Sequence, residues 1–185
     1  FSTRWFVRCY GLWLSRLHRR WGFDIVHCHS TYPNGYVAST CKDLKDVPQV
    51  ITSHGSDLDA LSLLGRKPQL RPRYVHALRS SQAAIAISGA TAQLLQQVDR
   101  TARIVHIPNG VDVQMLGRPQ PRPAELPETI QLNQYLLFLG RLVQRKGADL
   151  LIAAFAQTAA RHELTLVIAG EGPEELQLRM EAGGI

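Results

Sequence analysis

The sequence has no long hydrophobic run and few cysteines, and both shortages exclude classes of protein. No stretch reaches the roughly 18 to 20 apolar residues that a membrane-spanning helix requires, and no signal-peptide pattern is present. We therefore expect a cytoplasmic location. Cys9, Cys28 and Cys41 are an odd number without a C-x-x-C pair, which argues against a disulfide scaffold and a cysteine zinc site. Free thiols are expected.

The start of the chain carries much of the net charge of +6. Apolar residues recur there at every fourth position and predict an amphipathic helix; they are Trp5, Cys9, Trp13 and Leu17. Its arginines are Arg4, Arg8, Arg16, Arg19 and Arg20. Packing of the apolar stripe onto a sheet is the favoured prediction, and peripheral contact with the inner face of a membrane is the alternative. We expect no nucleic-acid partner, because the basic residues gather on one helix and no known binding motif occurs.

Residues 1–116 alternate short β-type runs with helical stretches. The predicted strands are Asp24–Cys28, Gln49–Thr52, Ala83–Ile87 and Arg103–Ile107, and the predicted helices between them include Gly35–Leu44 and Thr91–Val98. This order predicts a parallel sheet that is covered on both faces.

Residues 117–133 are rich in proline, which excludes a helix or a central strand and predicts an extended connector between domains. Residues 134–185 begin a second α/β domain, with strands predicted at Tyr135–Leu139 and Leu164–Ile168 and a helix at Ala148–Ala160. The strand at Tyr135–Leu139 is of the buried type. The fold class is α/β with two Rossmann-like parallel-sheet domains. We expect both domains to be incomplete and the chain to be truncated at both ends, because the second region buries too little surface to stand alone.

The loop from Gly140 to Gly147 follows a predicted strand and precedes a helix, and it contains Arg141 and Lys146. Ligands bind at the carboxyl edge of parallel strands, and two cations there suit a diphosphate. No P-loop and no dinucleotide fingerprint is present.

Six short segments occur in the order seen in family 4 retaining glycosyltransferases, and the chain resembles that family over nearly its whole length. The segments are Asp24–His29, Thr52–Asp57, Ala86–Ser88, Ile107–Asp112, Gly140–Gly147 and Ala169–Pro173. The resemblance implies a GT-B architecture, in which the first domain binds an acceptor and the second a nucleotide-diphosphate sugar. It also implies sugar transfer with retention, without a cofactor or a catalytic metal.

The resemblance assigns roles to individual residues. Arg141 and Lys146 match the pair that binds the donor diphosphate and stabilises the leaving group, and His54 matches a histidine that contacts the sugar or stabilises the transition state. Gly140, Glu171 and Gly172 complete the donor side, with Glu171 in place of the family's aspartate. His29, Gly55 and Asp57 are the further candidates on the acceptor side. From spacing alone, His27 and His29 share one face of a strand and are a weaker candidate for a metal pair.

Two family elements are absent from the sequence: the Glu-x7-Glu element of the second domain and the glycine-rich loop near the first strand. We therefore expect this chain to be inactive by itself, and the activity to belong to a full-length parent. The acceptor is expected to be lipid-linked or a polysaccharide of the cell wall or cell exterior. The alternatives are a nucleotide-sugar epimerase of the same fold and a non-catalytic homologue that binds sugar nucleotides.

Overall fold

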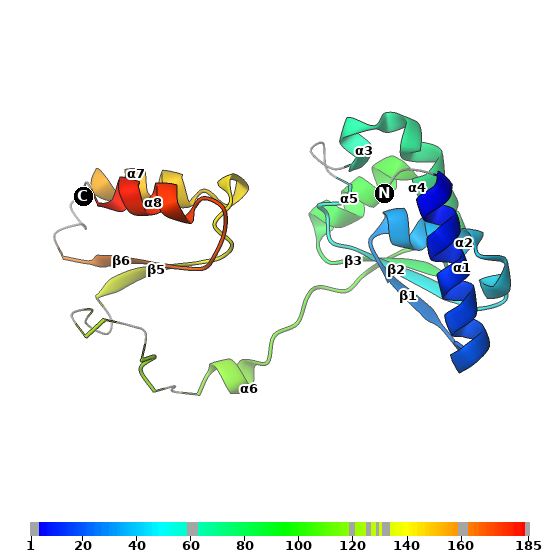
Figure 1. Ribbon diagram of the computed structural model, residues 1–185, viewed down its shortest axis with the longest axis horizontal. Helices are drawn as coiled ribbons and strands as arrows, with labels where there is room; N and C mark the ends of the chain where they lie inside the picture. The colour runs from blue at the N-terminus through cyan, green and yellow to red at the C-terminus, as the bar shows by residue number, and fades with distance from the viewer. Residues whose placement is uncertain are drawn as a thin grey trace. The chain divides into compact units, whose positions relative to one another are not determined.

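The computed structural model describes residues 4–58, 63–118, 121–124, 127–128, 130, 134–158 and 163–183. The chain forms two compact units, Phe1–Val113 and Gln114–Ile185 (Figure 1). Each unit is an α/β structure with a parallel sheet, which confirms the expected fold class.

The sheet of the first unit has the strand order β1-β2-β3-β4, with every neighbouring pair parallel. Its strands are β1 (Val26–His29), β2 (Gln49–Ser53), β3 (Ala83–Ala86) and β4 (Ile104–His106). All four predicted strands are confirmed, with bounds that differ by one or two residues. The largest shift is at β1, which begins two residues later than predicted and includes His29.

The helices of the first unit are α1 (Arg4–Trp21), α2 (Tyr36–Thr40), α3 (Leu63–Arg66), α4 (Arg71–Ser80) and α5 (Gly89–Val98). The predicted helix at Thr91–Val98 is confirmed, and Ser88 caps it by accepting a hydrogen bond from the Thr91 N–H. The helix predicted over Gly35–Leu44 is wrong as one element. A wide turn at Thr31–Gly35, α2 and a 3₁₀ turn at Lys42–Leu44 replace it.

Side-chain hydroxyls explain why α2 is short. Ser39 and Thr40 both donate hydrogen bonds to the carbonyl oxygen of Tyr36, at 2.9 Å each. Such local bonds compete with the helical backbone pattern and weaken a helix interior. Cys41 then adopts an extended conformation, and α2 ends at Thr40.

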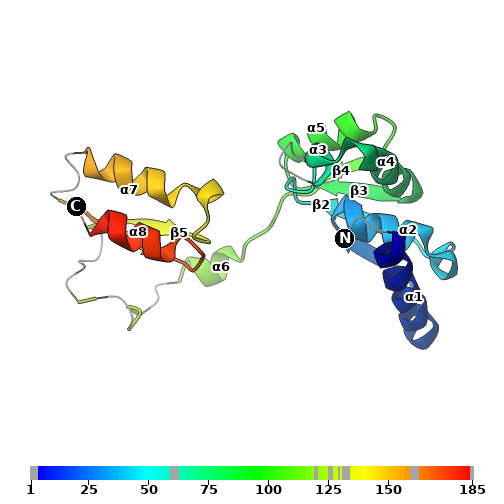
Figure 2. The same ribbon diagram turned by 45° about the horizontal axis from the view of Figure 1, so that its top comes forward.

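The described helices of the first unit form one layer, so the prediction of a sheet covered on both faces is wrong for this part of the chain. Helix α1 packs on α2, α2 on α4, and α4 on α5 (Figures 1 and 2). The strand order explains this, because right-handed crossovers that always step to the next strand place their helices on one face. Cys28 is buried towards the helices, whereas its neighbours His27 and His29 are exposed.

The predicted packing of the apolar stripe of α1 is also wrong. Trp5 is 75% exposed and Trp13 is 55% exposed. The helix instead contacts the rest of the unit through its opposite side, where the Ser15 hydroxyl lies 3.0 Å from the Cys41 thiol and that thiol donates to the Gly11 carbonyl. The three cysteines are free thiols, as predicted.

The second unit contains β5 (Tyr135–Leu139) and β6 (Thr165–Ala169), which pair in parallel. Its helices α7 (Ala148–Ala156) and α8 (Glu175–Ala182) lie on one face of these strands (Figures 1 and 2). The helix predicted over Ala148–Ala160 is confirmed as far as Ala156 and is wrong at Gln157 and Thr158, which are not helical; residues 159–160 lie outside the described residues. The interpretation of β5 as a buried strand is wrong, since Leu137 is 55% exposed and Leu139 79% exposed. Helices cover one face only, and alternate side chains point away from them.

The described residues of the predicted connector contain no helix or strand, and a short helix, α6 (Val113–Leu116), precedes them. Helix α6 was not predicted from the sequence. Within the described residues, no helix is both long enough and apolar enough to cross a membrane.

Candidate functional site

Two of the predicted acceptor-side histidines meet at the carboxyl ends of β1 and β2. His29 is the last residue of β1 and is in register with Thr52, while His54 follows the end of β2. The Nδ1 atom of His29 lies 2.9 Å from Nε2 of His54, and the rings stack with their planes 12° apart. A hydrogen bond between two ring nitrogens needs one donor and one acceptor, so at least one ring nitrogen of the pair is unprotonated.

His27 extends this pair to a row of three histidines. Its ring centroid lies 4.6 Å from that of His29, and its Nε2 atom lies 2.7 Å from the Thr52 hydroxyl. Desolvation, and then the charges of His29 and His54, lower the pKa of His27 below its usual value of 6.5. The three rings together present hydrogen-bonding nitrogens on the uncovered face of the sheet.

The histidine row does not form a metal site in this structure. Within the described residues, no group of three or more histidine, cysteine, aspartate and glutamate side chains is arranged to hold a metal ion. The spacing of His27 and His29 does put both rings on one face, but their further partners are Thr52 and His54. The chemistry that this arrangement offers is hydrogen bonding and proton exchange.

Asp57, another predicted acceptor-side residue, is partly buried and connects the segments that follow β1 and β2. Its Oδ2 atom accepts hydrogen bonds from the Thr31 N–H at 2.9 Å and from the Ser53 hydroxyl at 3.3 Å. The hydroxyls of Thr31 and Ser53 are 2.7 Å apart. Gly55, at φ +87°, turns the chain between His54 and Asp57 in a conformation that favours glycine. This network sets the position at which His54 leaves β2.

A contact between Tyr32 and Arg73 could not be predicted from the sequence. Arg73 Nη1 donates to the Tyr32 hydroxyl at 3.0 Å, and the guanidinium lies over the rings of Tyr32 and Tyr36 at 5.9 and 5.5 Å. Because 41 residues separate Tyr32 from Arg73, only the packing of α4 on the segment before α2 brings them together.

Predicted donor-side residues of the second unit meet where β5 and β6 end. Gly140, Arg141, Glu171 and Gly172 line one hollow of about 540 Å³. The Gly140 N–H donates to the Ala169 carbonyl at 3.1 Å, and the Leu142 N–H to the Glu171 carbonyl at 2.9 Å, so the two loops run together. Two exposed side chains of opposite charge, Arg141 and Glu171, border the hollow.

Glycine is required for this close approach of the two loops. A Cβ atom at Gly170 would lie 1.8 Å from the Gly140 carbonyl oxygen, and one at Gly172 would lie 2.1 Å from the Leu142 carbonyl oxygen. Neither contact is possible for a residue with a side chain, because both obstacles are backbone atoms. The glycines of the Ala169–Pro173 segment therefore build the wall of the hollow.

Lys146 lies on the same loop as Arg141 but does not line the hollow. It ends a 3₁₀ turn, Gln144–Lys146, and the following residue, Gly147, has φ +70° and starts α7. Lys146 is exposed. The structure thus brings four of the five donor-side residues together and leaves Lys146 at the start of the next helix.

A parallel α/β unit that presents a glycine-walled loop and an arginine at its strand ends is typical of proteins that bind nucleotide phosphates. The comparison with known families is more specific. The family described as Glycosyltransferase Family 4 matches residues 2–115, and the family described as Glycosyl transferases group 1 matches residues 128–184. The chain belongs to glycosyltransferase family 4.

Curated relatives agree with this assignment. An uncharacterized glycosyltransferase of Methanocaldococcus jannaschii is 31% identical over 72% of this chain and 34% of its own length. The O-antigen chain mannosyltransferase C of Escherichia coli is 28% identical over 86% of this chain and 41% of its own length. The D-inositol 3-phosphate glycosyltransferase of Segniliparus rotundus is 28% identical over 91% of this chain and 40% of its own length. The chain thus spans well under half of the length of these relatives.

Proposed function

We propose that this chain is part of an enzyme that transfers a sugar from a nucleotide-diphosphate sugar to an acceptor hydroxyl with retention of anomeric configuration. The observation that carries the proposal is the hollow at the ends of β5 and β6, where Arg141 stands beside a wall made of glycine backbone. A wall without side chains leaves room for a bulky anion, and an arginine at its edge supplies the charge that a diphosphate needs.

On the donor side, the guanidinium of Arg141 offers a planar set of N–H donors that fits two phosphate oxygens at once. Negative charge builds up on the diphosphate as the bond to the sugar breaks. A cation fixed at that place stabilises the transition state more than the bound substrate. Lys146 adds a second positive charge from the start of α7, and the reaction needs no cofactor.

On the acceptor side, His54 presents its ring at the end of β2, and His29 orients it through the hydrogen bond between the two rings. We propose that His54 contacts the sugar or the incoming hydroxyl. Asp57 and Gly55 hold the backbone of His54 in place, and His29 keeps one of its nitrogens engaged. The other ring nitrogen of His54 is then the one that reaches the substrate.

The names of the relatives indicate a biological setting. The Escherichia coli relative is named for O-antigen chains, which supports a role in the synthesis of a cell-surface polysaccharide with a lipid-linked or polysaccharide acceptor. Because relatives are more than twice as long, we assign the activity to a protein of their length and expect none from these 185 residues alone.

A transfer assay tests the proposal. A protein that contains this chain at the length of the relatives is incubated with uridine and guanosine diphosphate sugars and candidate acceptors, and NMR gives the anomeric configuration of the product. Arg141→Ala should lower kcat/KM by about 10²- to 10³-fold, as expected for loss of a group that stabilises transition-state charge.

The matched control for this assay is Arg145→Ala, which removes the same charge from the same exposed loop without touching the hollow. It should change kcat/KM by less than about threefold, the size of a surface-charge effect. Equal losses in both variants would reject the specific role of Arg141. Conversion of the donor sugar without transfer would favour the epimerase, and binding without any turnover would favour the non-catalytic homologue.

A further inference from the structure

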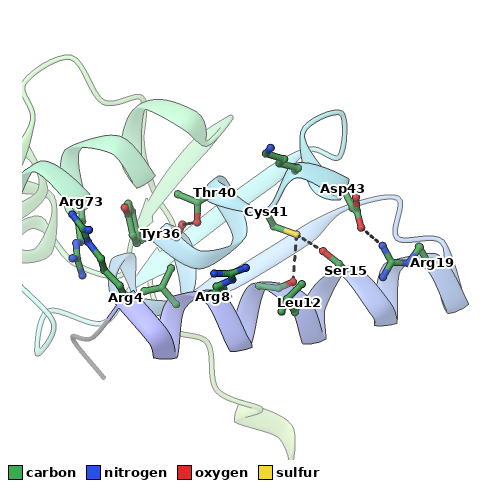
Figure 3. Close-up of a pocket in the computed structure, with 13 residues that line it drawn as sticks. Arg4, Arg8, Leu12, Ser15, Arg19, Tyr36, Thr40, Cys41, Asp43 and Arg73 are labelled. Carbon is green, nitrogen blue, oxygen red and sulfur yellow. Dashed lines mark hydrogen bonds and ion pairs between the residues drawn. The ribbon is translucent and has the colours of Figure 1, made fainter.

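A groove separates α1 from the start of α2 on the first unit (Figure 3). Its volume is about 880 Å³, within the range of roughly 300 to 1,000 Å³ that is usual for small-molecule sites. Gly11 lies along it, and a Cβ atom added there would meet nothing within 4 Å, so the space above this part of α1 is open. We call it the α1–α2 groove.

Positive charge dominates the lining of the α1–α2 groove. Its charged residues are Arg4, Arg8, Arg19, Lys42, Arg73 and Asp43. The one carboxylate is engaged at one end, where Arg19 Nη1 donates to Asp43 Oδ2 at 2.6 Å. Among the described residues, Arg4 and Arg8 form no ion pair with a carboxylate. Arg4 and Arg8 therefore repel each other, and an anion in the groove would offset that repulsion.

The side chain of Arg73 is held in place by two tyrosines. Its guanidinium lies over the rings of Tyr32 and Tyr36 and donates to the Tyr32 hydroxyl. Figure 3 shows Arg73 and Arg4 at the same end of the groove, with Arg8 between them and the Arg19–Asp43 pair. A cation fixed by aromatic contacts loses little side-chain freedom when it binds a ligand.

We propose that the α1–α2 groove binds the phosphate group of an anionic ligand, with Arg4, Arg8 and Arg73 as its contacts. Guanidinium groups bind phosphate oxygens in pairs, and three of them on one groove outweigh what a single surface arginine provides. This site belongs to the first unit, shares no residue with the donor hollow of the second, and does not depend on the proposed transfer reaction.

The phosphate can belong to a soluble phosphate compound or to the headgroup of a membrane lipid. The surface of α1 bears on this choice, because Trp5, Leu12 and Trp13 are all more than half exposed on the helix that forms one wall of the groove. Aromatic side chains beside arginines suit the boundary between headgroups and acyl chains. All three tryptophans of the chain, Trp5, Trp13 and Trp21, lie in α1, so their fluorescence reports on this helix alone.

The test uses the 185-residue chain with two probes, sodium pyrophosphate and vesicles that contain phosphatidylglycerol in phosphatidylcholine. Pyrophosphate binding is measured by calorimetry, and vesicle binding by co-sedimentation and by the tryptophan emission maximum. The Arg4→Gln/Arg8→Gln variant should bind at least one probe about 25-fold more weakly than the native chain, from about fivefold per arginine.

The matched control is Arg16→Gln/Arg20→Gln, which removes the same charge from exposed positions of the same helix outside the groove. It should lose less than about threefold. A blue shift of the emission with vesicles identifies the lipid headgroup as the source, and pyrophosphate binding without vesicle binding identifies a soluble ligand. The proposal is overturned if neither probe binds, or if the two double variants weaken binding equally, because only the net charge of the helix would then matter. Circular dichroism confirms that both variants keep the native helix content.

Discussion

The two units position their candidate functional residues by different means. In the first unit, side chains hold one another: His29 bonds to His54, His27 to Thr52, and Asp57 to the loop after β1. In the second unit, Arg141 and Glu171 are exposed, and backbone packing between glycine-rich loops places them. The first arrangement is set before any ligand arrives, whereas the second fixes the path of the chain and leaves the charged side chains to be ordered by the ligand.

The largest loss of stability is expected in the second unit, where backbone packing positions the candidate functional residues. Gly170→Ala would place a Cβ atom 1.8 Å from the Gly140 carbonyl oxygen at φ +153°, so the loops after β5 and β6 must separate. We expect a loss of more than about 3 kcal/mol in the stability of the second unit. Hydrogen exchange measured by mass spectrometry should show β5 and β6 losing protection while β1 to β3 keep theirs.

Gly55→Ala is the matched substitution in the first unit. Its Cβ atom would lie 3.5 Å from the Thr91 hydroxyl, an ordinary contact, so only the strain of φ +87° remains. The expected cost is about 1–2 kcal/mol. Equal costs at Gly55 and Gly170 would contradict the contrast between the two units.

Loss of a buried hydroxyl should destabilise the first unit, where side-chain hydrogen bonds do the positioning. Ser53 is completely buried, and its hydroxyl links Thr31 to Asp57. Ser53→Ala leaves Thr31 without a hydroxyl partner and Asp57 with one fewer donor, and we expect a loss of about 1–3 kcal/mol from the first unit. Urea unfolding followed by tryptophan fluorescence measures it, since every tryptophan lies in α1. An unchanged midpoint would show that the network does not hold the site.

The ion pairs of the two units give a smaller contrast that depends on pH. Arg79 donates to Asp99, whose side chain is 4% exposed, whereas Arg179 and Glu175 pair on the surface of α8. The hydrogen bond from Arg79 is the main cause that lowers the pKa of Asp99 to about 2. Arg79→Gln should cost about 1 kcal/mol at neutral pH, and Arg179→Gln about 0–0.5 kcal/mol.

The pH dependence follows from the lowered pKa. The contribution of ionised Asp99 is complete above its unfolded-state pKa of 3.8 and is lost as the pH falls towards about 2. The stability difference between the native chain and Arg79→Gln should therefore shrink over that interval in urea titrations. A difference that stays constant between pH 5 and pH 2 would exclude Asp99 as the group responsible.

The smallest effect on stability is expected from the protonation of His27. Its pKa lies below 6.5 because of desolvation and the two neighbouring histidines, so its neutral form is favoured in the folded state. Stability should fall as the pH decreases through the unfolded-state value, because unfolding then frees His27 to take up a proton. NMR titration of the ring should show the pKa of His27 rising in His29→Ala and staying unchanged in the control His106→Ala. No change in His29→Ala would mean that the rings do not interact.

Much of the fold could be predicted from the sequence, because alternating β-type runs and helical stretches fix the parallel order of strands. The covered face of the sheet and the packing face of α1 could not. The covered face depends on which strands are neighbours in the sheet. The packing face of α1 depends on polar contacts of Cys41 with the Ser15 hydroxyl and the Gly11 carbonyl, which hydrophobic spacing does not record.

Part of the candidate site could be predicted from the sequence, and part could not. The motifs predicted His54 and Arg141, since short segments keep these residues beside their strands. They did not predict the Thr31, Ser53 and Asp57 network or the contact of Arg73 with Tyr32, since residues more than 20 positions apart meet there through strand register and helix packing.

The most direct test of the central claim is the binding of donor to the second unit. Calorimetry would titrate uridine and guanosine diphosphate sugars into a protein that contains this chain at the length of its relatives, in native form and as Arg141→Ala and Arg145→Ala. We predict that one donor binds the native protein and Arg145→Ala alike and binds Arg141→Ala at least tenfold more weakly. Equal binding by all three proteins would contradict it.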